Sequence, residues 1–344
     1  MRLVVVGATG AVGTEILSIL EERGFAVDEL VPVASPRSTG RMLPFKGREF
    51  EVQVLSADVF DGADLALFDV DDRLAKEWAP VAAAAGAIVV DNSAAWRMDP
   101  DVPLVVPEVN PDDAFRRPKG IIASPNCTTL AMVVPLAPLH QAAGLERLIL
   151  ASYQATSGSG RAGVDDLWNQ TEIIAKEPDL ATAGLARDVL ESGASFPHPI
   201  AMNVIPRCGS VKENGYTSEE LKLCHETRKI MGISDLRVTA TCVRVPVITG
   251  HGVAVHAEFG REITPEEARS LLASAPGVEL QDDVEAEIYP MPLTAAGTDP
   301  CYVGRIRQDS FDLKALEMFC VADNLRKGAA LNTVQIAELL AVQH

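Results

Sequence analysis

Residues 124–129 place a cysteine where a nucleophile could act. The segment reads Ser-Pro-Asn-Cys-Thr-Thr, and Cys127 stands between an aliphatic run that ends at Ala123 and an apolar run over 130–139. If the second run is a helix, its dipole and the unpaired N–H groups at its start favour the thiolate. A thiolate is the form that accepts an acyl group. The alternative is a structural cysteine, since free cysteine is among the most buried residue types.

A histidine stands in a turn flanked by glycines. The segment Gly250-His251-Gly252 joins two strand-like runs, which predicts an exposed turn rather than a core position. Histidine titrates near neutral pH and is the usual general acid or base in enzymes. A lone loop histidine is more often simply solvated, and nothing in the spacing proves that His251 meets Cys127.

Four charged residues could recognise an anionic or zwitterionic substrate. Arg244 lies in the apolar strand 241–247, where a buried charge requires an anion or a carboxylate partner. Glu219 and Lys222 are three residues apart on a predicted helix, hence on one face, although an ordinary surface ion pair is the alternative. Arg97 follows a strand end, where open α/β sheets bind ligands.

The glycine-rich segment 7–13 predicts a dinucleotide site. It follows the strand-like run 3–6 and opens a helix, so its backbone can approach a diphosphate at a helix start. The second strand runs into Ala-Ser-Pro-Arg-Ser at 34–38, without the acidic residue that holds ribose hydroxyls in NAD-preferring sites. Arg37 and Ser38 suit a 2′-phosphate, which favours NADP; the alternative is a solvated loop arginine.

The elements that would position these residues change in character near residue 145. Before it, short aliphatic runs alternate with helix patterns, which is typical of a parallel, doubly wound sheet. The expected strands there are Leu3–Val6, Leu30–Ala34, Leu65–Phe68, Ala87–Val90 and Gly120–Ala123, with a crossover helix over Ala75–Ala85. After it, longer strands are expected over Leu148–Ala155, Ala201–Ile205, Val238–Ile248, Val253–Phe259 and Tyr302–Ile306. The spacing of the last three fits an antiparallel sheet with helices on one face.

Two helix starts are marked by sequence in the second half of the chain. Thr217 and Thr264 each stand three residues before a glutamate, the spacing of a capping box. The segment Lys176–Pro199 is irregular. The tail Leu331–Ala341 reads as a helix that could return to the first domain.

Composition excludes several classes of protein. The chain has 344 residues and a net charge of −18, from 30 basic and 48 acidic residues, which argues against nucleic acid or an anionic membrane as a partner. The longest uncharged apolar stretch, Trp78–Val90, is too short to span a bilayer. The N-terminus leads at once into the glycine motif without a secretory signal, so a cytoplasmic location is expected. Six cysteines without a CxxC pair disfavour both a disulfide framework and a metal site.

Together these residues resemble the aspartate-β-semialdehyde dehydrogenase family over nearly the whole chain. The similar stretches are 7–13, 90–93, 107–110, 125–129, 152–155, 157–160, 244–247, 250–251, 323–325 and 328–332. The Pro-Asn-Cys-Thr-Thr string favours this family over the related N-acetyl-glutamyl-phosphate reductases. The resemblance implies an α/β fold: a Rossmann-type doubly wound parallel sheet over residues 1–126 with 324–344, plus an α+β catalytic and dimerisation domain over 127–323.

The resemblance also implies roles for individual residues. Cys127 would be the nucleophile that forms an aspartyl thioester, His251 its acid/base partner, and Gln154 would position the acyl group. Arg244 would bind the substrate α-carboxylate and Glu219 its α-ammonium group. Arg97, Asn126 and Lys222 would hold phosphate, and the NADP-binding positions would be Thr9, Gly10, Ala11, Val12, Gly13, Arg37, Ser38, Ser157, Gly158 and Asn324.

The activity so implied is the NADP-dependent reductive dephosphorylation of L-aspartyl-4-phosphate to L-aspartate 4-semialdehyde. It would serve the biosynthesis of lysine and diaminopimelate, methionine and threonine, in a homodimer or a tetramer. Two rivals remain: a related acyl-phosphate or acyl-thioester reductase for another acid, and a non-catalytic NADP-binding regulator.

One departure from the family concerns residues 69–72. The segment reads Asp-Val-Asp-Asp, where the family commonly has a small, glycine-containing loop near the nicotinamide. Acids beside the cofactor phosphates repel them, so this loop either points away or tunes cofactor affinity.

Overall fold

The computed structural model describes residues 1–341, which form two compact units. The first unit comprises Met1–Asn126, His225–Ser234 and the segment from Leu325 onward; the second comprises Cys127–Cys224 and Asp235–Asn324. The last three residues of the expected range 324–344 lie outside the described residues.

Residues 225–234 belong to the first unit, whereas the sequence placed them in the second domain. Lys229 explains the difference, because its Nζ donates to the backbone oxygens of Arg97, Asp99 and Val102, each at 2.7 Å. A side chain that satisfies three carbonyl groups fixes its helix to the loop that carries them.

A six-stranded sheet, parallel throughout, forms the first unit, as predicted. Its strand order is β5-β2-β1-β6-β7-β8. The strands are β1 (Arg2–Val6), β2 (Glu29–Ala34), β5 (Gln53–Val54), β6 (Leu65–Phe68), β7 (Ile88–Asp91) and β8 (Ile121–Ala123). An unpredicted hairpin of β3 (Met42–Phe45) and β4 (Arg48–Glu51) precedes β5. The aliphatic runs that the sequence marked as strands are buried because helices cover both faces of the sheet.

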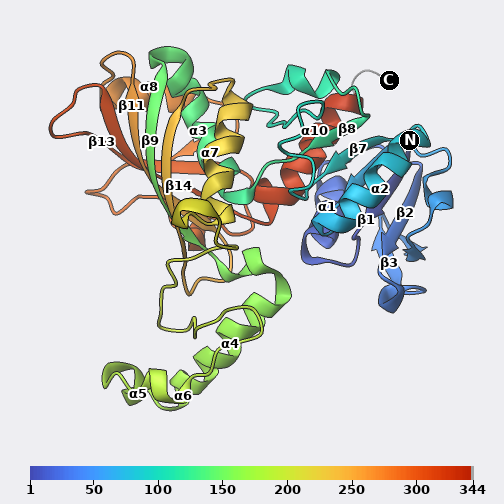
Figure 1. Ribbon diagram of the computed structural model, residues 1–344, viewed down its shortest axis with the longest axis horizontal. Coiled ribbons are helices and arrows are strands. Elements are labelled where there is room, and N and C mark those ends of the chain that lie inside the picture. The colour runs from blue at the N-terminus through green and yellow to red at the C-terminus, as the bar shows by residue number, and fades with distance from the viewer. Residues whose placement is uncertain (342–344) are drawn as a thin grey trace. The chain divides into compact units, whose positions relative to one another are not determined.

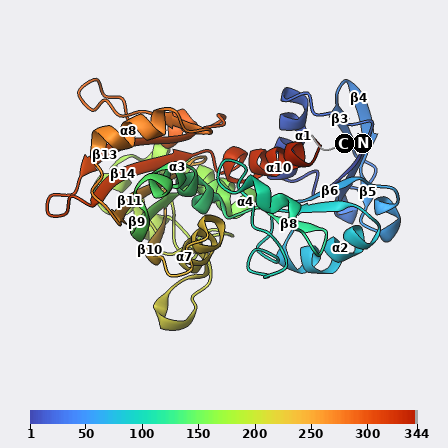
Figure 2. The same ribbon diagram turned by 90° about the horizontal axis from the view of Figure 1, so that it is seen from above.

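Three helices cover that sheet. Helices α1 (Ala11–Glu22) and α10 (Leu331–Ala341) lie on one face, and α2 (Asp72–Ala84) lies on the other (Figure 2). The side chains of Ile16, Leu331 and Val334 belong to one core cluster with those of β1. The predicted return of the C-terminal helix to the first domain is therefore confirmed.

The second unit contains a six-stranded mixed sheet with the order β10-β9-β11-β14-β13-β12. Its strands are β9 (Leu145–Gln154), β10 (Arg237–Arg244), β11 (His251–Phe259), β12 (Val278–Leu280), β13 (Cys301–Gln308) and β14 (Ala315–Ala322). The antiparallel sheet expected for β10, β11 and β13 is wrong, because these three strands do not pair with one another; the sheet is mixed, since β9 with β10 and β12 with β13 run parallel. Helices α3 (Cys127–Ala143) and α8 (Pro265–Ala273) pack on one face (Figure 1).

Two expected strands of the second unit differ from the structure. Ala201–Ile205 is not a strand: Met202 has a φ of +56°, and only Ile205 pairs, through an isolated bridge to Arg244. The strand expected to reach Ile248 ends at Arg244, because Pro246 lacks the N–H that a continued ladder requires.

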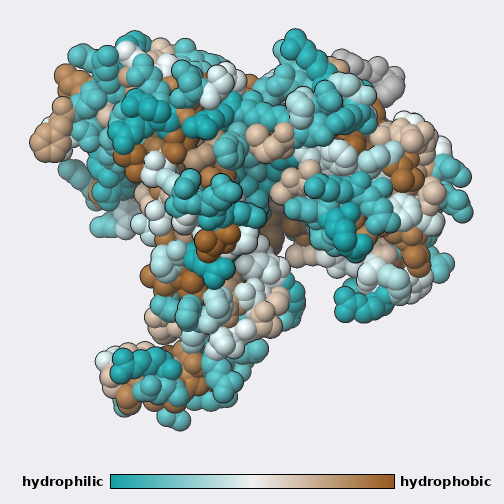
Figure 3. Space-filling model, viewed as in Figure 1, coloured by the Kyte–Doolittle hydropathy of each residue, from teal (hydrophilic) through white to brown (hydrophobic). Residues whose placement is uncertain are grey.

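An arm of helices projects from this sheet within the second unit (Figure 1). It consists of α4 (Gly160–Lys176), α5 (Asp179–Thr182) and α6 (Ala186–Val189), so short helices occupy the segment read as irregular. The arm has a small core of its own around Leu167 and Phe196. Apolar side chains also lie on its surface (Figure 3), among them Trp168 with 57% of its area exposed.

Both predicted helix starts are confirmed. At α7 (Ser218–Met231), Glu220 Oε2 accepts from the Thr217 N–H at 2.7 Å and Thr217 Oγ1 accepts from the Glu220 N–H at 3.3 Å, a complete capping box. At α8, Thr264 Oγ1 accepts from the Glu267 N–H at 3.1 Å. A short helix, α9, spans Pro292–Ala295. Within residues 1–341, we find no helix of the length and hydropathy that a bilayer crossing requires.

Candidate active site

Strand register brings three predicted site residues to one edge of the second unit's sheet. Gln154 ends β9 and Arg244 ends β10, and the two are paired in the parallel ladder. His251 begins β11, whose next residue, Gly252, pairs with Tyr153 of β9. The ends of two parallel strands and the beginning of an antiparallel one therefore meet, with Gln154 in the middle strand.

The backbone of one residue, Ala155, binds both of the outer residues. The Ala155 N–H donates to His251 Nδ1 at 3.0 Å, and the Ala155 carbonyl oxygen accepts from Arg244 Nη1 at 2.5 Å. Because a backbone N–H only donates, Nδ1 is unprotonated, and neutral His251 carries its proton on Nε2. Burial and the Arg244 charge lower the pKa of His251 to about 3, so the ring is neutral at physiological pH.

The Nε2–H of His251 is a buried donor. The exposed turn expected at His251 is wrong, because the residue begins β11 and pairs with Ala322 of β14, and its side chain is fully buried. Its Nε2 has no hydrogen-bond partner among residues 1–341. A buried donor without a partner costs about 1–3 kcal/mol, which marks this atom as one that a ligand would satisfy.

Gly158 packs closely against that atom. A methyl group at Gly158 would lie 3.0 Å from Arg244 Nη1 and 3.1 Å from His251 Nε2. Asn324 ties this turn to the histidine turn, since its Nδ2 donates to Ser157 Oγ at 2.9 Å and its Oδ1 accepts from the Gly250 N–H at 2.8 Å. Two predicted cofactor positions, Ser157 and Asn324, are thus bonded to each other.

A polar chain extends from the middle strand to helix α7. Gln154 Nε2 donates to Glu219 Oε1 at 3.0 Å, and its Oε1 accepts from Ser152 Oγ at 3.0 Å. Lys222 Nζ donates to the other Glu219 oxygen at 3.1 Å. The predicted proximity of Glu219 and Lys222 on one helix face is confirmed, and Glu219 is 8% exposed, so the pair is not an ordinary surface ion pair.

Cys127 is the first residue of α3, as predicted, and is partly exposed. Its thiol group acts electrostatically on Cys208, whose pKa is raised to about 12 by burial and by Glu219 and Cys127, while Arg244 offsets part of the increase. Cys127, Arg244 and Glu219 therefore all lie close enough to Cys208 to change the pKa of its thiol.

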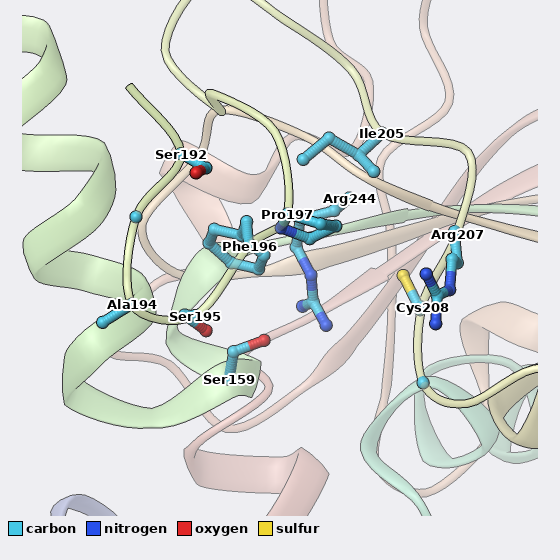
Figure 4. Close-up of a pocket in the computed structure, with 12 residues that line it drawn as sticks. Ser159, Ser192, Ala194, Ser195, Phe196, Pro197, Ile205, Arg207, Cys208 and Arg244 are labelled. Carbon is cyan, nitrogen blue, oxygen red and sulfur yellow. The ribbon is translucent and has the colours of Figure 1, made fainter. Parts of the chain in front are cut away.

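A pocket of about 540 Å³ opens beside Arg244. Its lining includes the hydroxyl groups of Ser159, Ser192 and Ser195. In Figure 4 the Arg244 guanidinium extends into the pocket between Phe196 and Arg207, and its Cζ lies 5.8 Å from the centre of the Phe196 ring. Sequence reasoning missed Arg207, because it stands in an irregular segment outside any motif.

In the first unit, the glycine loop has the backbone that a diphosphate requires. Gly7 has a φ of +94°, and a methyl group there would lie 2.0 Å from the Asp69 carbonyl oxygen. A methyl group at Gly13 would lie 2.1 Å from the Gly7 oxygen. Gly10 is the N-cap of α1, so the N–H groups of the first turn, from Ala11 and Val12 onward, are available to an anion.

The end of β2 lies against this loop. Gly7 N–H donates to the Val33 oxygen at 2.8 Å, and Thr9 Oγ1 donates to Ser38 Oγ at 3.3 Å. Arg37 is exposed in the short turn Pro36–Ser38. The predicted cofactor residues of this unit are therefore brought together, in an arrangement that fits a dinucleotide.

Arg97, a predicted phosphate ligand, is already engaged by protein groups. Its guanidinium donates to Glu226 Oε1 at 3.1 Å, to the Ser124 oxygen at 2.9 Å and to the Asn92 oxygen at 2.7 Å. Glu226, 1% exposed, also accepts from the Asn126 N–H at 2.7 Å. An anion at Arg97 must share its donors with Glu226, a residue that carried no motif signal in the sequence.

Comparison with known proteins gives a consistent result. Residues 2–116 match the family model of the semialdehyde dehydrogenase NAD binding domain, and residues 136–327 match that of the semialdehyde dehydrogenase dimerisation domain. The aspartate-semialdehyde dehydrogenase of Aquifex aeolicus is 50% identical over 342 residues, which cover 98% of this chain and 97% of the relative.

Two solved structures extend the comparison. The aspartate semialdehyde dehydrogenase II of Vibrio cholerae, complexed with ASA, has a TM-score of 0.92 and 41% identity, with 100% of this chain and 98% of that chain covered. The enzyme of Candida albicans, solved with NADP, has a TM-score of 0.75 and 26% identity, with 99% and 98% covered. This chain is therefore an oxidoreductase that belongs to the aspartate-semialdehyde dehydrogenase family.

Proposed function

We propose that this chain catalyses the NADP-dependent reductive dephosphorylation of L-aspartyl-4-phosphate to L-aspartate 4-semialdehyde through a thioester on Cys127. The observation that carries the proposal is the buried His251 Nε2–H, which has no hydrogen-bond partner among residues 1–341 and lies beside Gly158 and Arg244. A carbonyl oxygen that gains negative charge is the acceptor that such a donor suits.

Cys127 begins the reaction in this mechanism. Its thiolate attacks the acyl carbon, the carbon–sulfur bond forms, and the carbon–oxygen bond to phosphate breaks. Bound NADPH would supply the hydride that reduces the thioester carbonyl. The resulting thiohemiacetal then collapses, so that the carbon–sulfur bond breaks, the aldehyde leaves and the thiolate returns.

His251 acts on the carbonyl oxygen in both addition steps. Its Nε2–H donates to the oxygen as negative charge develops there, and this proton is the one exchanged with the thiohemiacetal. The Ala155 N–H holds the ring in this tautomer, since it requires an acceptor at Nδ1. A neutral donor in a buried site retains its function over a wide pH range, because its own titration lies far below neutrality.

Charged groups of the second unit fit a substrate that is an amino acid. Arg244 would bind the α-carboxylate from within the pocket, and Glu219 would bind the α-ammonium group. Gln154 positions the acyl group while it holds Glu219. Lys222, together with Arg97 and Asn126 of the first unit, would hold the phosphate.

NADP would be held by residues that each unit contributes. In the first unit these are the loop Thr9, Gly10, Ala11, Val12 and Gly13, with Arg37 and Ser38 for the 2′-phosphate. In the second unit they are Ser157, Gly158 and Asn324. The preference for NADP over NAD rests on the guanidinium of Arg37 at the end of β2.

The remaining parts of the proposal concern the setting of the enzyme. The match of residues 136–327 to a dimerisation domain supports a homodimer, which could pair into a tetramer. We place the enzyme in the cytoplasm, in the biosynthesis of lysine and diaminopimelate, methionine and threonine.

The deciding experiment is phosphate-dependent reduction of NADP and of NAD with L-aspartate semialdehyde, using wild type and Cys127→Ser. We expect turnover with NADP that falls at least about 1,000-fold in the variant. A folded wild type that binds NADP but turns over neither cofactor would instead favour a non-catalytic regulator.

The related-reductase rival requires a second variant. Glu219→Gln should damage turnover of the aspartyl substrate more than that of an acyl phosphate without an α-amino group. Equal losses with both substrates would contradict the assigned α-ammonium contact.

A further inference from the structure

Two of the three acids in residues 69–72 have structural roles. Asp71 is the N-cap of α2, and its Oδ1 accepts from the N–H groups of Arg73 at 2.9 Å and Leu74 at 3.0 Å. Asp72 Oδ1 accepts from the Ala94 N–H at 2.8 Å. These bonds direct both carboxylates to backbone donors, which leaves Asp69 as the acid whose role the fold does not explain.

Asp69 lies beside the glycine loop. It follows β6, and its N–H donates to the oxygen of Val6, the last residue of β1, at 2.8 Å. Its backbone oxygen excludes a side chain at Gly7, and its Oδ2 lies 3.8 Å from where a methyl group on Gly10 would stand. Since Gly10 is the N-cap of α1, the carboxyl group faces the place where the loop would receive a diphosphate.

A like charge acts on Asp69 from the neighbouring strand. Asp91 ends β7 and is paired in register with Phe68, the residue before Asp69. Burial and the charge of Asp91 together raise the pKa of Asp69 to about 6, although the Asn92 amide offsets part of the increase. The pKa of Asp91 is also raised to about 6 by burial, although Ser93 and Arg97 lower it and Asp72 raises it.

The first turn of α1 places no charged side chain beside Asp69. This turn reads Ala-Val-Gly-Thr, so the loop offers N–H groups but no ionisable side chain to Asp69. A dinucleotide at this loop therefore brings its diphosphate to a carboxyl group that already faces Asp91.

We propose that Asp69 couples dinucleotide binding to the uptake of one proton, so that the bound state holds Asp69 as a neutral carboxylic acid. The neutral acid removes a repulsion and gains an O–H that can donate to a diphosphate oxygen. This inference rests on the proposed dinucleotide site. The direction of the effect follows from linkage: binding is strongest below the pKa of free Asp69 and weakens as the pH rises above about 6.

The test is the dissociation constant of NADP, from fluorescence titration of the full chain between about pH 5.5 and 7.5. The proteins are wild type, Asp69→Asn and the control Asp61→Asn, which removes one exposed carboxylate from the same unit. The 2′-phosphate titrates near pH 6 itself, but this term is common to all three proteins. The readout is therefore the ratio of each variant's constant to that of wild type.

As the pH rises across this range, we expect the NADP dissociation constant of wild type to increase by up to about 20-fold relative to that of Asp69→Asn, because the amide mimics the neutral acid at every pH. Asp61→Asn should keep the wild-type profile. A constant ratio for Asp69→Asn would overturn the proposal, and so would a pH-dependent ratio for the control.

Calorimetry of wild type gives a second, independent readout. In two buffers with different ionisation heats at about pH 7, the proposal predicts net uptake of close to one proton on binding, which Asp69→Asn should lose. Absence of proton uptake by wild type would contradict the proposal even if the variant does not fold. Failure of every protein to bind NADP at any pH would instead contradict the dinucleotide site itself.

Discussion

The site in the second unit is built from side chains: Gln154, Arg244 and His251 lie at one edge of a sheet, where two strands end and a third begins. The glycine loop of the first unit instead depends on the absence of side chains where its backbone packs closely. The first arrangement depends on register, and the backbone N–H and C=O groups of Ala155 fix two of the three side chains. The second depends on close backbone contact, as at Gly7. Substitutions of the three side chains at the sheet edge should therefore change chemistry more than folding, while those of closely packed glycines should change both.

Gly158→Val tests the sheet edge most severely. The branched side chain would displace Arg244 Nη1 and His251 Nε2, so we expect kcat/KM to fall at least about 100-fold. The thermal unfolding midpoint should fall as well, because the Cβ alone would lie within 3.1 Å of both buried side chains. Gly158→Ala should give smaller losses in the same directions. An unchanged kcat/KM in Gly158→Val would show that the positions of Arg244 and His251 do not limit the reaction.

His251→Gln tests the donor at that edge. We expect kcat to fall about 100-fold, because the amide cannot reproduce the position of Nε2–H. Stability should change in a defined pH window. The pKa of His251 is about 3 in the folded chain and near 6.5 when unfolded, so only the unfolded state takes up the proton as the pH falls through this range.

Wild type should therefore lose more stability than His251→Gln between pH 7 and about pH 4.5, as urea denaturation would measure. Above about pH 7 both states are neutral at this position, and the histidine contributes no pH dependence there. Equal losses in the two proteins would contradict a buried, neutral His251.

Glu226→Gln tests the first unit, where the buried carboxylate of Glu226 pairs with the guanidinium of Arg97. The amide can still accept from Asn126 N–H but no longer neutralises Arg97, so we expect a loss of about 2 kcal/mol in the free energy of unfolding. If Arg97 binds phosphate, the KM for phosphate should fall about fivefold, because the anion no longer shares the guanidinium with a carboxylate. An unchanged KM would remove Arg97 from the phosphate site.

How far the sequence could predict this molecule depends on the range of the interaction. The aliphatic β1, the apolar α3 that begins at Cys127 and the tail helix α10 are local patterns, and each was predicted. The parallel pairing of β9 with β10 was not, because it joins segments that are far apart along the chain.

The site shows the same division. Glu219 with Lys222 followed from helix spacing, whereas Glu226 acts through tertiary hydrogen bonds that no motif marks. Ala155 lies in a family-like stretch, but its backbone N–H and C=O groups act independently of residue type, so the sequence could not indicate their role. Residues that act through their own side chains were thus easier to predict than those that hold them.

Arg37→Ala has the smallest expected effect and tests whether the glycine loop needs a charged neighbour. Arg37 is exposed, so its loss should leave the unfolding midpoint unchanged. We expect the dissociation constant of NADP to rise about tenfold and that of NAD to change little, since the guanidinium serves the 2′-phosphate alone. The control is Arg41→Ala, another exposed arginine nearby. Equal weakening of NADP binding by both variants would mean that only the total positive charge near the loop, and not the position of Arg37, affects binding. Selective weakening by Arg37→Ala would mean that a side chain, and not only the backbone of the loop, determines the choice of cofactor in the first unit.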